Sequence, residues 1–178
     1  MELRILKESQ VTQSLDEEIR KNLVISFPHN EDIFSHSRKW RGNVPFYNVV
    51  LLDGDIVCAH VAVVDRTILA GGTNLRVAGV ANVFVLPGYR GKGLSDKILI
   101  TAMAEAKKLE FDCGLLFTGE NIKHIYTRNG WLRISGQKFI AVANGIEYSL
   151  PPNKPIMYYP LSNSNFPPGT IHLQGNRW

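Results

Sequence analysis

The stretch that decides the fold reads Val83-Phe84-Val85-Leu86-Pro87-Gly88-Tyr89-Arg90-Gly91-Lys92-Gly93-Leu94-Ser95. Its first residues are apolar and β-branched, which predicts a strand that ends at Pro87. A short loop with three glycines and two cations follows. From Leu94 onward the apolar residues recur at three- and four-residue steps, which predicts an amphipathic helix. These apolar positions are Leu94, Ile98, Leu99, Ala102, Met103, Ala106 and Leu109.

A glycine-rich loop that leads into a helix is suited to binding an anion. The first N–H groups of a helix lack intrahelical acceptors, and the helix dipole places partial positive charge there. Glycine lets the backbone approach the anion closely, while Arg90 and Lys92 add charge. We interpret the loop as a cradle for a pyrophosphate group. The plainer alternative is a strand-to-helix turn with solvated cations that binds nothing.

Two other phosphate-binding motifs fit this loop poorly. Gly88 and Gly93 have the separation of the P-loop glycines, but Leu94 stands where the phosphate-binding lysine is required. A dinucleotide fold needs an early strand–loop–helix unit with its own glycine pattern and an acid about 20 residues further on. The sequence shows neither feature.

The loop resembles motif A of the GCN5-related N-acetyltransferases, in which Arg/Gln-x-x-Gly-x-Gly/Ala follows a strand with an alternating Val-x-Val. Here the loop reads Arg90-Gly91-Lys92-Gly93-Leu94-Ser95, and Ser95 stands in for the small last residue of the motif. The resemblance implies that backbone amides of this loop hold the pyrophosphate of acetyl-coenzyme A, namely those of Arg90, Gly91, Lys92, Gly93, Leu94 and Ser95. It also implies that the strand residues Val83, Phe84 and Val85 pair through their backbone with the pantetheine arm.

The length of 178 residues suits one domain, and we expect a single acyl-coenzyme A N-acyltransferase domain over residues 1–178. Hydrophobic residues make up 44% and charged residues 20%, as in globular soluble proteins. No apolar run approaches the ~20 residues of a membrane span, and the N-terminus has no secretory hydrophobic region. The net charge of +4 fits an anionic cofactor but is too small to indicate nucleic-acid binding. We expect a cytoplasmic monomer or homodimer without a nucleic-acid or membrane partner.

Cysteine and histidine usage argues against a disulfide and against a metal site. Cys58 and Cys113 each lie in an apolar run, so we expect buried free thiols in a reducing compartment. No metal site is indicated, because four of the histidines lie at no metal-ligand spacing with cysteine: His29, His36, His124 and His172. His60 has apolar neighbours on a strand, so we expect a hydrogen-bonded core residue there.

The rest of the chain predicts an α+β fold. Strands are expected at residues 2–6, 48–52, 56–64, 75–85, 113–117, 132–134, 139–142 and 156–159. Helices are expected at 15–25 with Ser14 as its cap, after the glycine loop, and at 121–129 before Gly130. The tail from Ser162 to Trp178 has no periodicity. This order predicts a mixed, mostly antiparallel twisted sheet with helices on both faces, and the resemblance implies the same acetyltransferase fold.

Tyr126 is the strongest catalytic candidate. It lies in Ile125-Tyr126-Thr127-Arg128-Asn129-Gly130-Trp131, which resembles the Leu-Tyr-x-x-x-Gly-Phe segment of the family. The resemblance implies that its hydroxyl donates a proton to the leaving thiolate of coenzyme A. A phenol with a pKa of about 10 stays protonated at neutral pH and is suited to that role. The alternative is a tyrosine that only packs in the core.

The sequence leaves open which group deprotonates the attacking ammonium. Many members of the family use a glutamate on the strand before the loop, but here that strand reads Val80-Ala81-Asn82-Val83 and carries no acid. The proton would then leave through water, Glu120, Glu31, Asp32 or the chain terminus.

Two subgroups of the family look nearer than the rest. The pattern Ala59-His60-Val61-Ala62-Val63-Val64-Asp65-Arg66 and the terminal Trp178 are similar to features of aminoglycoside 2′-N-acetyltransferases. The Ala-His strand and the tail at 167–171 are similar to nodulation protein A-like acyltransferases. Both resemblances imply an amino-sugar amine as acceptor. The resemblance to the aminoglycoside enzymes implies a substrate contact from Trp178, and we expect further substrate contacts from Glu31 and Asp32. A frayed terminus is the alternative for Trp178.

Together these features predict an N-acetyltransferase that moves an acetyl group from acetyl-coenzyme A to a primary amine of a small molecule by direct attack in a ternary complex. The amide at the strand end would polarise the thioester carbonyl. The alternative is a non-catalytic acyl-coenzyme A sensor or interaction module with the same fold.

Overall fold

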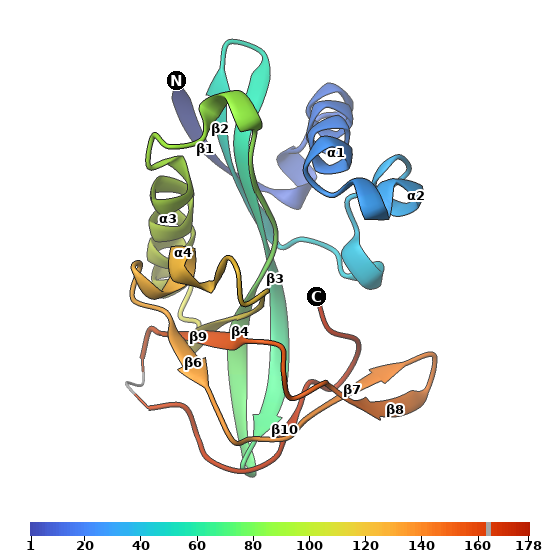
Figure 1. The fold of residues 1–178 in the computed structure, drawn as a ribbon, viewed down its shortest axis with the longest axis vertical. Helices are drawn as coiled ribbons and strands as arrows, with labels where there is room; N and C mark the ends of the chain where they lie inside the picture. Colours follow the sequence, from blue (N-terminus) through green and yellow to red (C-terminus); the bar gives the residue numbers. More distant parts are fainter. Residues whose placement is uncertain (163–164) are drawn as a thin grey trace. The chain divides into compact units, whose positions relative to one another are not determined.

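The computed structural model describes residues 1–162 and 165–178 (Figure 1). By their contacts these fall into two compact units, Met1–Val64 with Val80–Ala102 and Asp65–Gly79 with Met103–Trp178. Three elements run through both units: β3 (Ile56–Ala70), β4 (Thr73–Val85) and α3 (Leu94–Lys108). That the chain is one functional domain stays a prediction.

The first unit contains the expected hairpin. Strand β2 (Tyr47–Asp53) pairs antiparallel with the first part of β3, and β1 (Glu2–Lys7) pairs antiparallel with β2. The hairpin turn contains Gly54, whose φ of +59° is in the left-handed region that favours glycine. The predicted strands at 2–6, 48–52 and 56–64 are therefore confirmed.

The first long helix begins one residue before its predicted cap. Helix α1 (Gln13–Ser26) is capped by Thr12, whose hydroxyl accepts a hydrogen bond of 3.3 Å from the amide of Leu15. The prediction of Ser14 as the cap was wrong, because Ser14 already lies in the first helical turn and Thr12 has the extended backbone that a cap needs. A short α2 (Glu31–Phe34) follows after Pro28, and one-turn 3-10 helices occur at Glu8–Gln10, Pro28–Asn30, Trp40–Gly42 and Pro87–Tyr89.

Helices cover both faces of the sheet in this unit. Val50 packs in a core cluster with Ile19 and Leu23 of α1. Tyr47, three positions earlier on β2 and hence on the opposite face, donates a hydrogen bond of 2.7 Å to the carbonyl of Ala102 in α3. The predicted two-sided covering is confirmed here.

The second unit extends the sheet in the order β6-β9-β5-β4-β3-β10-β7-β8. The added elements are β5 (Cys113–Phe117), α4 (Lys123–Thr127), β6 (Leu132–Ile134), β7 (Phe139–Ala143), β8 (Ile146–Ser149), β9 (Ile156–Pro160) and β10 (Ile171–His172). The β4–β5 and β10–β7 pairs are parallel, and the remaining pairs with a described register are antiparallel. The prediction of a mixed, mostly antiparallel sheet is confirmed.

Two strands and one helix boundary differ from the prediction. The tail from Ser162, of which residues 163–164 lie outside the described residues, forms β10 between β3 and β7, with Ile171 opposite Ala70 and Phe139. Strand β8 completes a hairpin whose turn residues Asn144 and Gly145 both have positive φ. The helix predicted at 121–129 covers Lys123–Thr127.

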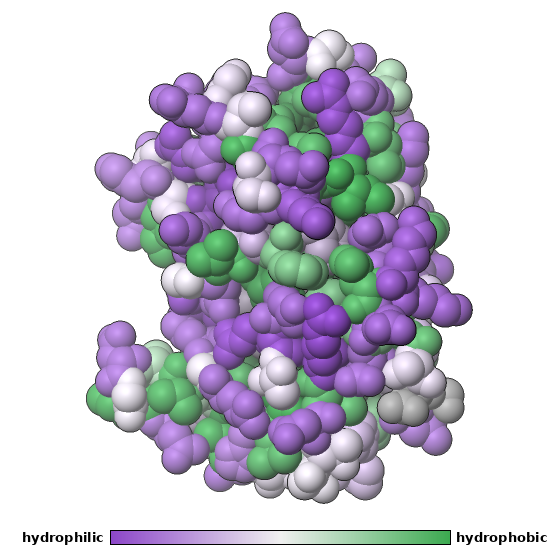
Figure 2. All heavy atoms as spheres, turned by 180° about the vertical axis from the view of Figure 1, so that it is seen from behind, coloured by the Kyte–Doolittle hydropathy of each residue, from purple (hydrophilic) through white to green (hydrophobic). Residues whose placement is uncertain are grey.

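On the face shown in Figure 2, hydrophilic residues predominate and hydrophobic ones occur in small groups between them. No helix within 1–162 and 165–178 is long and apolar enough to cross a bilayer.

Candidate active site

The predicted anion-binding loop has the expected backbone. Strand β4 ends at Val85, the 3-10 helix Pro87–Tyr89 follows, and α3 begins at Leu94. Gly91 and Gly93 have φ values of +77° and +70°. A Cβ atom at either position would meet no atom within 4 Å. Glycine is therefore required by the left-handed backbone, and the space beside the loop is open.

Four successive amides of this loop are available to a ligand, whereas the amide of Arg90, also predicted to bind the pyrophosphate, donates to the carbonyl of Pro87 at 3.3 Å. The first bond of the helix runs from the amide of Lys97 to the carbonyl of Gly93, at 3.2 Å. Among the described residues, the amides of Gly91, Lys92, Gly93 and Leu94 donate to no backbone carbonyl. Free amides at the positive end of a 15-residue helix favour an anionic group.

Side chains tie the loop to its surroundings. Arg90 is exposed, and its Nε donates a hydrogen bond of 3.1 Å to the carbonyl of Val85. The hydroxyl of Tyr89 donates to Asp53, the last residue of β2, at 2.9 Å, and Lys92 lies 5.2 Å from the centre of the Tyr89 ring. The loop thus presents two cations from a position anchored at the neighbouring hairpin.

The strand before the loop has one face in the core. Phe84 is 4% exposed and stacks on the ring of His60 at 5.5 Å, in the cluster that also contains Ile19 and Leu23. Val83 and Val85 point the other way and are half-buried. The side chain of Phe84 is therefore unavailable to a cofactor, and the predicted contact from this residue is left to its backbone. The ladder between β4 and β5 ends at Gly79 opposite Leu115.

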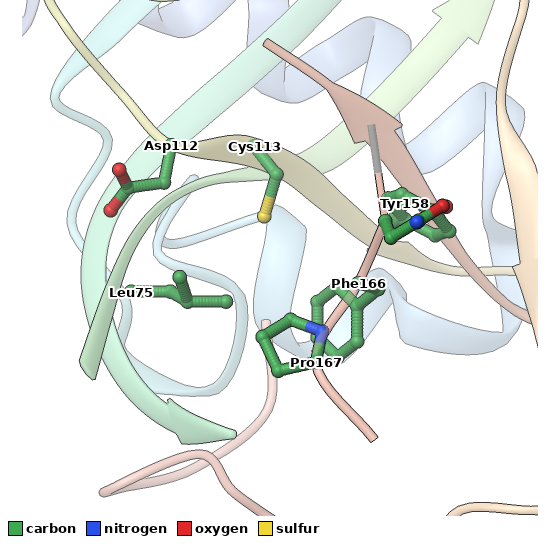
Figure 3. A pocket seen from close by; sticks show the side chains of 7 residues that line it. Leu75, Asp112, Cys113, Tyr158, Phe166 and Pro167 are labelled. Carbon is green, nitrogen blue, oxygen red and sulfur yellow. The ribbon is translucent and has the colours of Figure 1, made fainter. Parts of the chain in front are cut away.

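The cysteines are buried free thiols, as predicted. Burial raises the pKa of Cys113 to about 12, and nearby Asp112 acts in the same direction. Asp112 and Cys113 line a hollow of the second unit, together with Leu75, Tyr158, Asn165, Phe166 and Pro167 (Figure 3). None of the predicted site residues lines this hollow, and a protonated thiol is a poor nucleophile. No group of three or more His, Cys, Asp or Glu side chains in the described part of the chain is placed to hold a metal ion.

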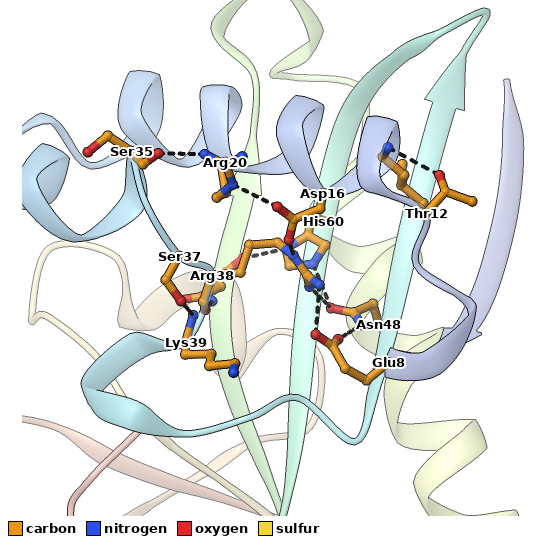
Figure 4. A network of polar contacts seen from close by, with 12 residues as sticks. Glu8, Thr12, Asp16, Arg20, Ser35, Ser37, Arg38, Lys39, Asn48 and His60 are labelled. Atoms are coloured by element: carbon orange, nitrogen blue, oxygen red, sulfur yellow. Dashed lines mark hydrogen bonds and ion pairs between the residues drawn. The ribbon is translucent and has the colours of Figure 1, made fainter.

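His60 is a hydrogen-bonded core residue, as predicted. It is fully buried; its Nδ1 lies 2.9 Å from the carbonyl of Asn82 and its Nε2 lies 3.1 Å from Oδ1 of Asn48 (Figure 4). Burial lowers the pKa of His60 to about 3; the bond to Asn82 opposes this change and Arg38 adds to it. A buried ring with such a pKa is no base for a substrate amine at neutral pH.

The acids proposed to contact the amine or to accept its proton are on the surface. Glu31 and Asp32 are exposed in the first turn of α2, and no described contact joins them to the glycine loop. Glu120, in the second unit, pairs with Lys123 and with Arg133 at 2.8 Å. The hydrogen bond from Lys123 is the main cause of the lowered pKa of Glu120. A carboxylate held in its charged form in this way is a weak base.

Tyr126 lies in α4 of the second unit and is 7% exposed. Its ring meets Trp131 edge-on at 6.1 Å. Burial raises the pKa of Tyr126 to about 12, and Thr118 acts in the opposite direction. No hydrogen bond of good geometry joins the two hydroxyls, because Oγ1 of Thr118 is buried without a partner. The phenol is thus protonated at neutral pH, as a proton donor must be.

Trp178 is not frayed. It is 3% exposed, its indole N–H donates to the carbonyl of Leu115 at 3.2 Å, and its ring packs edge-on against Phe117. The guanidinium of Arg66 lies 5.5 Å from the ring centre and donates to the carbonyls of Leu173 and Asn176. The alternative of a loose end is wrong, and a substrate contact from this residue stays a prediction.

Some residues of this region were missed by sequence reasoning. Asn82 has a φ of +52° inside β4, and Arg38 is 5% exposed at the centre of an ion-pair network. An asparagine among β-branched residues was a usable signal, because asparagine is enriched at positive φ. Arg38 gave no signal, since its partners are 22 and 30 residues away in the sequence.

Comparison with known proteins places this geometry in a family. Residues 8–134 match the family described as Acetyltransferase (GNAT) domain. The chain is 25% identical over 143 residues to an aminoglycoside 2′-N-acetyltransferase from Mycolicibacterium fortuitum, a match covering 80% of this chain and 71% of that protein.

Solved structures show the same fold. Escherichia coli ElaA is similar with a TM-score of 0.65 and 11% identity, over 89% of this chain and 98% of its own. The E. coli GNAT family N-acetyltransferase YhbS, solved in complex with CoA, gives 0.62 and 15% over 97% and 88%. A GCN5-related N-acetyltransferase from Kribbella flavida gives 0.56 and 21%; the match covers 75% of this chain and 34% of that one, so this chain spans about a third of that protein.

These likenesses confirm the predicted α+β acetyltransferase fold, and the family match covers more than half of the sequence. The chain belongs to the GCN5-related N-acetyltransferase (GNAT) family.

Proposed function

We propose that this chain is an N-acetyltransferase that transfers an acetyl group from acetyl-coenzyme A to a primary amine of a small molecule. The observation that carries the proposal is the loop before α3, where the amides of Gly91 to Leu94 have no backbone acceptor among the described residues and two cations stand beside them. Family membership supports acyl transfer to an amine.

The residues present fit an anionic cofactor with a long arm. Acetyl-coenzyme A supplies an acetyl thioester. In the proposal, the amides from Gly91 to Ser95 bind its pyrophosphate, and the backbone of Val83 and Val85 pairs with its arm. Arg90 contributes its charge, because its amide donates to the carbonyl of Pro87. The open space beside Gly91 and Gly93 is consistent with a close approach of phosphate oxygens.

The proposed chemistry needs no covalent enzyme intermediate. Direct attack by the amine is favoured by holding both reactants in one site. Cys113 is protonated at neutral pH because burial raises its pKa to about 12, so this residue does not supply a thiolate nucleophile. Tyr126, itself protonated, is the proposed donor to the departing thiolate.

We propose that the proton of the incoming ammonium leaves through water. Strand β4 carries no acid, since Ala81 and Asn82 precede Val83. The ion pairs of Glu120 make it a weak base. Glu31 and Asp32 are exposed and remain candidates that substitution will test.

An amino sugar is the first acceptor to test. The relative from M. fortuitum is an aminoglycoside 2′-N-acetyltransferase, and its match covers most of this chain. A polycationic drug is a less fitting acceptor than a simple amino sugar, because tight binding of several ammonium groups requires carboxylates. The tail offers Asn176 rather than an acid.

A non-catalytic sensor of acyl-coenzyme A is the second candidate. The observation that favours it is the missing acid on β4 together with the ion-paired state of Glu120. Such a module would bind the same cofactor through the same loop but transfer nothing.

Release of free coenzyme A distinguishes the two. The purified chain is incubated with acetyl-coenzyme A and a panel of amino sugars, polyamines and amino acids, and binding is measured by calorimetry. Turnover that falls in Tyr126→Phe but not in the buried control Tyr47→Phe supports the transferase. Binding without turnover across the panel supports the sensor, and absence of binding refutes both.

A further inference from the structure

Strand β4 contains a left-handed residue one position before the proposed arm-binding segment. Asn82 has a φ of +52°, and it is not a glycine. Residues with positive φ persist where their surroundings hold them, and they gather at functional sites. Val83 follows directly, so the conformation of Asn82 sets the direction in which the last residues of β4, Val83 to Val85, continue.

Two separate contacts hold Asn82. Its carbonyl accepts a hydrogen bond from Nδ1 of His60 at 2.9 Å, and its side-chain amide donates to the carbonyl of Arg38 at 2.8 Å. One contact fixes the backbone and the other fixes the side chain. Nδ1 of His60 is the donor of the first contact, because a carbonyl only accepts.

Those two holders belong to one buried network (Figure 4). The guanidinium of Arg38 donates to Glu8 at 2.7 Å, to Asp16 at 2.6 Å and to Oδ1 of Asn48 at 3.2 Å. Asn48 in turn lies 3.1 Å from Nε2 of His60 and donates to Glu8 at 3.0 Å. The network joins the first strand–helix connection, α1, β2 and β3 to one residue of β4.

Burying polar and charged side chains in a network of this kind costs desolvation free energy. Arg38 is 5% exposed, and Asn48 and His60 are fully buried. Well-packed apolar side chains usually stabilise such a place as well or better, and buried ionic groups specify a particular geometry in some proteins. Its convergence on a left-handed residue of the proposed cofactor strand gives it a specific role.

We propose that His60 is a positioning residue, which holds the left-handed turn at Asn82 and thereby aims the backbone of Val83 to Val85 at the acyl thioester arm. This inference rests on the proposed function. His60 does not touch the reactants in it: the ring is fully buried, and Nδ1 is used by the strand.

The test compares variants that keep or remove the bond to Asn82. His60→Asn can place an amide donor near the position of Nδ1, whereas His60→Leu places none. We expect His60→Leu to raise the KM for acetyl-coenzyme A or lower kcat by about tenfold or more, because a small misplacement of a reacting group has effects of this size. His60→Asn is expected to restore most of the loss.

Substitution of Asn82 tests the same idea if His60→Leu does not fold. Asn82→Gly keeps the left-handed conformation, while Asn82→Val opposes it because a β-branched residue is disfavoured at positive φ. We expect acetyl-coenzyme A to bind Asn82→Gly within about threefold of the wild type and Asn82→Val about tenfold or more weakly. Asn144→Val is the matched control: Asn144 has a φ of +51° in the β7–β8 turn, so it perturbs a similar conformation away from β4.

The outcomes separate this inference from the proposed function. A wild type that neither binds nor turns over acetyl-coenzyme A overturns both. An active wild type whose folded His60→Leu and Asn82→Val variants keep normal constants overturns only the positioning role. A loss equal to that of Asn144→Val at the same stability also overturns it, while a loss rescued by His60→Asn supports it.

Discussion

The lowered pKa of His60 predicts how the free energy of unfolding changes with pH. Its pKa is lowered from 6.5 to about 3 in the folded chain, with burial as the largest cause. Between about pH 6.5 and pH 3, His60 is therefore protonated in the unfolded chain but neutral in the folded chain. Because the folded pKa is the lower one, stability rises with pH through this window and is lost as pH falls.

The expected size follows from linkage. Between pH 7 and pH 5 the free energy of unfolding should fall by about 2 kcal/mol on account of His60 alone, since each pH unit below the unfolded pKa costs about 1.4 kcal/mol. This figure holds for any folded pKa well below 5. Burial acts to raise the pKa of the Asp16 carboxyl, but the hydrogen bonds and charges of Arg20 and Arg38 together lower it. Asp16 therefore contributes below this window.

Urea unfolding at pH 7, 6 and 5 measures the effect as the difference between wild type and His60→Asn. The variant lacks the titrating ring, so its stability should lose about 2 kcal/mol less than the wild type over this range. His29→Asn, which removes an exposed histidine, serves as control and should parallel the wild type.

Two results would refute the reasoning. Parallel profiles for wild type and His60→Asn would mean that the ring titrates alike in both states. A wild type that gains stability relative to His60→Asn on acidification would mean that the buried ring is protonated. Nitrogen chemical shifts of the His60 ring would detect a protonated ring directly. This measurement is informative because both ring nitrogens face oxygen atoms, one of Asn82 and one of Asn48.

Four further outcomes are expected. Tyr126→Phe should lower kcat about 100-fold while acetyl-coenzyme A still binds, as judged by steady-state kinetics and calorimetry; an unchanged kcat would remove Tyr126 from the mechanism. Gly91→Ala should cost about 1 kcal/mol in urea unfolding, because its φ of +77° disfavours a Cβ atom, and should weaken cofactor binding if the amides form the cradle. Arg38→Ala should destabilise the chain by about 3 kcal/mol, the lower end for a broken buried ion pair because its two carboxylate partners are partly exposed; a loss below about 1 kcal/mol would mean that the pairs add little. Trp178→Phe should cost about 1 kcal/mol through the lost bond to the Leu115 carbonyl, and only a substrate contact would also raise the KM for the amine.

Local features of the fold were predictable from the sequence because their causes are local. The change from a β-branched run to helical spacing at Leu94 reflects the different periods of strand and helix. The glycines at 91 and 93 occupy left-handed positions that other residues avoid. The hairpin around Gly54 follows the same logic.

Other features depended on partners that are distant in the sequence. Strand β10 is only two residues long, too short for any periodicity, and it exists because β3 and β7 both offer backbone partners. The cap at Thr12 rather than Ser14 depends on where the chain turns out of the preceding 3-10 helix. The side chain of Phe84 is in the core because α1 covers that face of the strand.

The sequence by itself determined the family, the glycine loop and the candidate proton donor, since each is a short pattern whose chemistry depends on neighbouring residues. Only the tertiary structure decided that Arg38 is buried between Glu8 and Asp16, that His60 bonds the carbonyl of Asn82, and that Trp178 is packed rather than free. The physical reason is that hydrogen bonding and burial of these groups depend on side chains brought together from far along the chain, and no local pattern encodes such meetings.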